Sequence, residues 1–151
     1  MEPALELSGQ PVKRGTMAHE HVVYMMLVDS AARTGDESAI RKFAPRLEEL
    51  VLRDDHKPYL AVAHRAWGVA HRLSGEYTDA ETRLGKALEI FEELESRWQI
   101  ARTLFEMGEL ALAQADGGAA HSYFTRAQEL FEELGAGPDI ARTAAVLEKL
   151  N

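Results

Sequence analysis

The chain has 151 residues, 46% hydrophobic and 28% charged, which is the composition of one ordinary globular domain. Its 25 acidic residues outnumber 17 basic ones, and the net charge of −8 argues against nucleic acid or an anionic membrane as partner. There is no cysteine for disulfides or metal ligation, and the longest apolar run, residues 22–28, is too short to span a bilayer. The expected compartment is the cytoplasm.

Residues 1–16 differ from the rest of the chain. They contain two prolines and two glycines and show little periodicity. We expect a tail that is disordered or derived from an expression tag, followed by one domain over residues 17–151. The alternative is an arm that packs on the first structural unit.

The rest of the chain is predicted to form helices in pairs. Apolar residues recur at helical spacing, and breakers such as Gly35 and Gly75 divide the pattern. The pairs form three helix–turn–helix units, at 18–53, 58–95 and 97–134. The expected helices span residues 18–34, 37–53, 58–74, 77–95, 97–115 and 119–134, and a final helix spans 138–151.

Two of these units are copies of each other. The residues at 91–94 and 100–103 recur unchanged at 131–134 and 140–143, a shift of 40 residues for all eight identities. A period in this range indicates one supersecondary unit repeated along the chain. No strand-like alternation is present, so the sequence predicts an all-α solenoid of three units with a C-terminal capping helix.

The small and large residues of the repeat resemble those of the tetratricopeptide repeat family. Small residues lie at Gly68 and Gly108 and large ones opposite them at Leu84 and Phe124. Without a side chain at Gly68 the partner helix can approach more closely, which increases dispersion contacts. The resemblance covers about residues 18–151 and implies a right-handed superhelix that acts as a protein-interaction scaffold.

The chain departs from the family pattern in three ways. Its period is 40 residues, longer than the family's usual 34, its first unit is degenerate, and the family's terminating proline is absent after units two and three. Long-period units of this texture resemble the repeat arrays of large bacterial transcription regulators and signal-transducing ATPases. The chain is expected to be part of such a protein or a short relative of it.

The resemblance also implies where a partner would bind, because the first helices of each unit line the concave groove in that family. The matching groove positions are Val22, Met25, Asp29, Val62, Arg65, Val69, Arg72, Arg102, Phe105, Glu109, Leu112 and Arg142. The four arginines suit carboxylate contacts and would favour an acidic peptide or helix. The alternative is that they pair with nearby glutamates such as Glu106 and Glu109.

The apolar run at residues 22–28 is apolar around its whole circumference, which is typical of a helix buried on all sides. At the end of an array one side of this helix would face water. Three explanations stay open: a missing preceding unit, a homodimer surface, or coverage by residues 1–16.

No motif for catalysis, metal binding or a cofactor was found. There is no glycine-rich phosphate loop, nucleophile turn or histidine metal helix, and His64 and His71 lie about 10 Å apart along one helix, too far to share an ion. We therefore expect a non-catalytic module that binds a protein or peptide, within a bacterial regulatory or signalling system. The alternative is a regulatory domain that senses a small molecule or peptide in a closed pocket.

Overall fold

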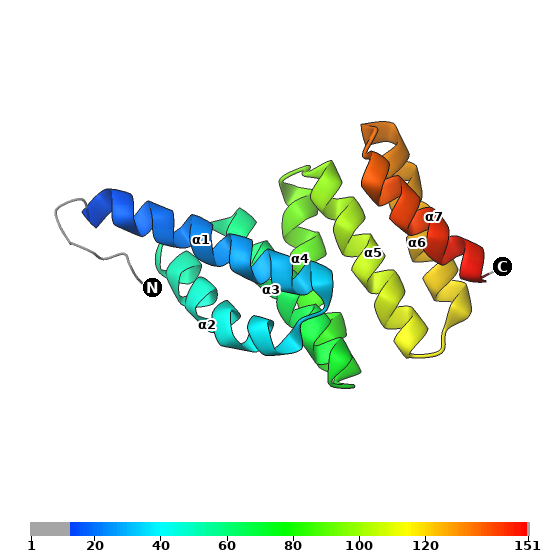
Figure 1. Cartoon of the computed structure of the whole chain (residues 1–151), viewed down its shortest axis with the longest axis horizontal. Helices are drawn as coiled ribbons and strands as arrows, with labels where there is room; N and C mark the ends of the chain where they lie inside the picture. Colours follow the sequence, from blue (N-terminus) through cyan, green and yellow to red (C-terminus); the bar gives the residue numbers. More distant parts are fainter. Residues whose placement is uncertain (1–12, 151) are drawn as a thin grey trace.

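The computed structural model describes residues 13–150 as seven α-helices with no strand among them, and its side chains from residue 20 onward (Figure 1). The helices are α1 (Lys13–Thr34), α2 (Glu37–Arg53), α3 (Lys57–Leu73), α4 (Tyr77–Glu93), α5 (Arg97–Ala113), α6 (Gly117–Leu134) and α7 (Gly137–Leu150). Consecutive helices pack in pairs along the array. The predicted all-α fold class is confirmed.

The helix ends differ from the sequence prediction by a few residues. Helix α1 begins at Lys13, so residues 13–16, which were expected in the tail, are helical. Residues 1–12 lie outside the described part of the chain, and the proposed division into tail and domain stays a prediction. Helices α4 and α5 end two residues early because Glu95 and Ala115 adopt left-handed backbone angles, with φ of 55° and 62°.

The turns between helices follow one geometry. Each contains a single residue with positive φ, and these residues are spaced by 20 along the chain: Gly35, Asp55, Gly75, Glu95, Ala115 and Gly135. The residue after each one donates its backbone N–H to a carbonyl five positions back, as Glu76 does to His71 at 2.8 Å. This bond satisfies a carbonyl that the helix end would otherwise leave unpaired.

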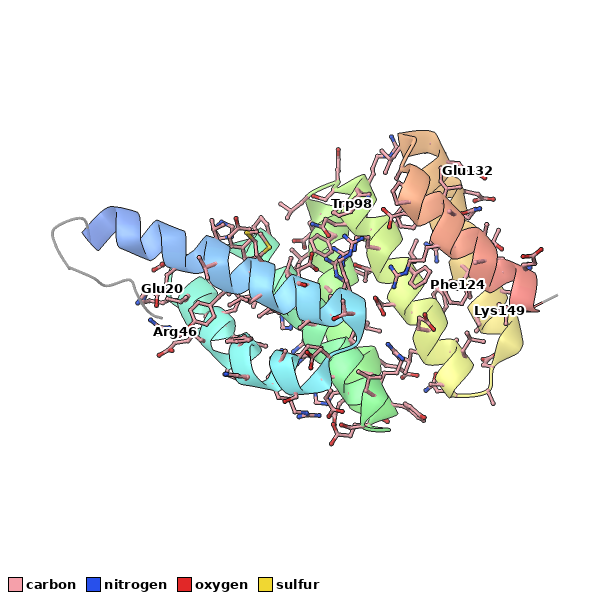
Figure 2. All side chains as sticks on the ribbon, in the orientation of Figure 1. Glu20, Arg46, Trp98, Phe124, Glu132 and Lys149 are labelled. Carbon is pink, nitrogen blue, oxygen red and sulfur yellow. The ribbon has the colours of Figure 1, made fainter. Side chains whose placement is uncertain are left out.

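The two predicted close approaches are present. A Cβ atom added to Gly68 would lie 2.6 Å from Leu84 Cγ, and one added to Gly108 would lie 2.7 Å from Phe124 Cζ. Phe124 of α6 points into the array beside α5 (Figure 2). Since no real side chain tolerates such distances, glycine at these two positions fixes how closely α3 packs on α4 and α5 on α6.

Four helices share one side of the array. Helix α1 packs on α3 as well as on α2, and α3 contacts α5. Helix α7 completes this row, because its Arg142 lies over the Phe105 ring of α5. We call the side formed by α1, α3, α5 and α7 the odd-helix face. Within the described chain, no helix combines the length and hydropathy needed to cross a membrane.

Candidate partner-binding face

The odd-helix face brings together groove residues that are far apart in the sequence. Asp29 of α1 contacts Arg102 of α5, and Arg142 of α7 contacts Phe105 of α5. The predicted groove positions therefore converge on α5. Their exposure, however, differs widely. Val22 is exposed, whereas the half-buried members are Met25, Asp29, Arg72, Glu109, Leu112 and Arg142, and the buried members are Val62, Arg65, Val69, Arg102 and Phe105.

At one end of the face, Asp29 bridges two arginines. Its Oδ1 lies 3.2 Å from Arg65 Nη2, and its Oδ2 lies 2.9 Å from Arg102 Nη1. We call these three residues the ion-pair cluster. Burial alone would raise the pKa of Asp29, but the hydrogen bond from Arg102 and the charge of Arg65 bring this pKa below its ordinary value. The carboxylate is therefore ionised at neutral pH.

Arg65 is the most enclosed member of the ion-pair cluster. Only 1% of its side chain is exposed, and Nη1 also donates to Thr103 Oγ1 at 3.2 Å and to the Gln99 carbonyl at 3.3 Å. Its guanidinium carbon lies 5.1 Å from the centre of the Phe91 ring. Burial, and then the nearby charge of Arg102, lower the pKa of Arg65 to about 10, which leaves it charged at neutral pH.

These contacts correct part of the sequence interpretation. Arg65 and Arg102 were expected to offer free charge to an acidic partner, or else to pair with glutamates of α5. They are instead buried and hydrogen-bonded to Asp29 from α1. In the observed arrangement, a partner reaches neither guanidinium without displacing Asp29.

Trp98 joins the first helix to the last beside the ion-pair cluster. Its Nε1 donates to Asp139 Oδ2 of α7 at 2.9 Å, and the guanidinium carbons of Arg102 and Arg33 lie 5.1 Å and 5.9 Å from its ring centre (Figure 2). Arg33 of α1 also lies 3.9 Å from Asp139 Oδ1. Sequence reasoning missed these residues, because nothing in their local spacing links α1 to α5 and α7.

The other end of the face has a different electrostatic arrangement. Arg72 Nη2 lies 3.8 Å from Glu106 Oε1, beyond hydrogen-bonding distance, and the buried Arg72 Nε has no hydrogen-bond partner among the described residues. The guanidinium carbon of Arg142 lies 4.1 Å from the Phe105 ring centre. Neither arginine donates a hydrogen bond to another described side chain. We call Arg72 and Arg142 the arginine pair.

Glu106 lies between these two arginines and is 5% exposed. Burial, reinforced by the nearby Glu109, raises the pKa of Glu106, although Arg72 and Arg142 both act to lower it. Two cations therefore face one buried acid. The sequence analysis considered Glu106 only as a pairing partner for the arginines, and its burial depends on tertiary packing that spacing alone does not reveal.

Two shallow hollows lie elsewhere on the described surface. A hollow of about 370 Å³ follows α1 from Met25 to Thr34, and one of about 510 Å³ lies between Gln128 of α6 and the outer side of α7. Each is lined by one or two helices and opens to solvent. Neither is the closed pocket that a small-molecule sensor would need.

One group in the described chain has spacing suited to a cation. The nearest ligand atoms of His71, Glu76 and Asp79 lie within 4.8 Å of one another. The group does not make a convincing metal centre, because Glu76 Oε1 already accepts from Arg41 at 3.3 Å and contacts His71 Nδ1 at 2.7 Å. His64 lies apart from it, beside Arg83, with Nδ1 and Nη1 3.0 Å apart.

One comparison with known proteins identifies the repeat. The tetratricopeptide repeat family matches residues 58–133, half of the chain, and this range contains α4, α5 and most of α3 and α6. No curated protein sequence matches the chain significantly. Helices α1, α2 and α7 lie outside the matched residues, although they continue the same packing.

Proposed function

The chain belongs to the tetratricopeptide repeat family, whose domains are generally non-catalytic protein-interaction modules, and we propose that it binds an acidic segment of a partner protein on the odd-helix face. The contact site would be the end of the face that contains the arginine pair. The resemblance of its long repeats to those of bacterial transcription regulators and signalling ATPases supports a regulatory role.

The observation that carries this proposal is the uneven use of the four arginines. Asp29 neutralises Arg65 and Arg102 through short hydrogen bonds. Arg72 has only a 3.8 Å contact with Glu106, and Arg142 has only the Phe105 ring, among the described residues. The guanidinium donors of the arginine pair are therefore available to a new acceptor.

The chemistry of this end favours a carboxylate ligand. An arginine guanidinium presents parallel N–H donors that match the two oxygens of a carboxylate. Two arginines beside a single buried acid leave one positive charge in excess, on a protein whose net charge is −8. Phe105 holds Arg142 in place by cation–π contact, which limits the entropy lost when a ligand binds.

Apolar side chains next to the arginine pair would provide the remaining affinity. Leu112 is half-buried one to two turns beyond Glu106 on α5, and Glu109 lies between them. A segment that places an acidic residue at the arginine pair would place a neighbouring residue over Leu112. We expect apolar residues near the acidic one in bound segments, with lysine and arginine disfavoured at the acidic position.

Selection from a random peptide library on the immobilised protein tests the proposal. Selected peptides should be enriched in aspartate or glutamate, and the Arg72→Gln/Arg142→Gln variant should weaken their binding by about tenfold or more in fluorescence anisotropy. The matched control is Arg126→Gln, an exposed arginine of α6 outside the odd-helix face. Peptides without acidic enrichment, or equal binding by both variants, would contradict the proposal.

A further inference from the structure

Helix α1 exposes a continuous apolar surface. Val22, Val23, Met26 and Leu27 lie on successive turns of one side, and 39%, 37%, 60% and 40% of their surfaces are exposed. We call these four residues the α1 stripe. The other exposed large apolar residues of the described chain stand singly, mostly near helix ends. Clustered apolar exposure of this kind marks an interaction surface.

The repeat shows what normally covers this surface. A shift of 40 residues places the α1 stripe on Val62, Ala63, Ala66 and Trp67 of α3. Ala63 and Ala66 are fully buried, packed against Val28 of α1 and Ala44 of α2. The stripe therefore occupies the position that, in the second unit, is buried against the preceding unit.

The stripe is not built for another repeat of the same kind. Where α3 has Ala63 and Ala66, which let the preceding unit approach closely, α1 has the bulkier Val23 and Met26. A preceding repeat with the same spacing would meet these side chains where the array has methyl groups. The surface therefore suits a neighbour that packs at a different distance and angle.

The electrostatics around the stripe favour a second copy of the chain. Residues 13–53 contain seven basic and six acidic residues, whereas residues 54–151 contain ten basic and 17 acidic ones. The first unit is therefore the near-neutral end of an acidic molecule, and two copies can meet there without strong repulsion. The flanking Glu20 is already paired with Arg46 of α2 at 2.9 Å (Figure 2).

The shape of this side of α1 is also self-complementary. The stripe projects from the helix, and the hollow of about 370 Å³ lies beside it, lined by Met25, Met26, Ser30 and Arg33 among others. A two-fold axis across α1 places the projecting side chains of each copy against the hollow of the other. Such matching of one surface with itself is what a closed dimer requires.

We propose that the α1 stripe is the contact surface of a homodimer in which α1 packs antiparallel on α1 of a second copy. Four side chains from each copy form the apolar centre, and Met26, the most exposed, adapts its shape to fill it. The patch is small for a permanent interface, so the dissociation constant should be on the order of 10 µM. The acidic-segment proposal does not depend on this dimer.

Sedimentation equilibrium of the full chain, from roughly 1 µM to 500 µM, tests the dimer. The wild type should convert from monomer to dimer and go no further, whereas Met26→Glu should stay monomeric, because a dimer would bury two like charges together. The matched control is Leu52→Glu, at a residue that is 63% exposed and lies outside the stripe. It should dimerise like the wild type.

Circular dichroism and melting temperatures of both variants verify that each is folded. A monomeric wild type at every concentration would overturn the proposal, as would a Met26→Glu variant that still dimerises. Equal loss of dimer in both variants would assign the effect to added charge in general and not to the stripe. Growth beyond the dimer would indicate head-to-tail assembly and would also overturn the two-fold arrangement.

Discussion

Asp29 Oδ2 lies 2.9 Å from Nη1 of Arg102, a residue 73 positions further along the chain. Through this contact, and through Arg65, one carboxylate joins the first, third and fifth helices. The contact fixes the position of α1 against units two and three. It also separates the odd-helix face into a neutralised end and an end whose arginines have few partners.

The first prediction concerns this carboxylate. Asp29→Asn should lower the free energy of unfolding by about 3 kcal/mol, because it leaves two buried guanidinium groups without a counter-charge. Urea unfolding followed by circular dichroism measures the change. Glu129→Gln, which removes an exposed acid of α6, serves as the control and should change stability little. A loss below about 1 kcal/mol for Asp29→Asn would mean that water replaces the carboxylate.

The second prediction concerns helix contact at Gly108. The added methyl group of Gly108→Ala would lie 2.7 Å from Phe124 Cζ, so the variant should be destabilised by about 2 kcal/mol or more despite alanine's better helix propensity. Gly85→Ala in α4 is the matched control, because its Cβ would have no neighbour within 4 Å. That variant should be stabilised by about 0.5–1 kcal/mol. A stable Gly108→Ala protein would refute the close packing of α5 on α6.

The third prediction concerns pH. Burial, and then the charge of Arg83, lower the pKa of His64 from 6.5 to about 4. The unfolded chain takes up the proton first as pH falls, so the free energy of unfolding should decrease below about pH 6.5 and level off below about pH 4. An NMR titration of the His64 ring gives the midpoint directly. His64→Gln should lack this contribution, and a His64 midpoint near 6.5 would contradict the buried setting.

The fourth prediction concerns the attachment of α7. Trp98→Phe keeps an aromatic ring but removes the hydrogen bond to Asp139, which is 7% exposed. We expect a loss of about 1–2 kcal/mol and faster amide exchange in α7 than in α3. Trp67→Phe is the control, because its indole bonds to Glu48 of α2 and lies away from α7. Unchanged exchange in α7 would show that its apolar contacts alone hold it.

Local patterns were sufficient to predict the helices and their pairing. The apolar periodicity and the 40-residue repeat predicted seven helices, and Gly68 and Gly108 correctly predicted close helix contacts. Turns were predicted where glycine is present, as at Gly75. The left-handed Asp55 and Glu95 were not recognised, because their conformation comes from the helix-ending hydrogen bonds and not from a residue preference.

The distribution of charge on the odd-helix face could not be predicted in the same way. The family resemblance placed Asp29, Arg65 and Arg102 on one face, and the structure brings all three together. Which arginine is neutralised depends on how far α1 reaches across α3 to α5. That reach is a property of the whole array, and no local spacing in the sequence encodes it.

The even spacing of the left-handed turn residues, 20 positions apart from Gly35 to Gly135, makes the chain a molecule that can be counted in steps. Removing one step of 20 residues would exchange inner and outer helices beyond the cut, whereas two steps together would preserve every face. A duplicate of residues 97–136 inserted after 136 would therefore add one unit and move α7 outward by one place. The chain length of such an array can change only in increments of 40 if its binding face is to stay continuous.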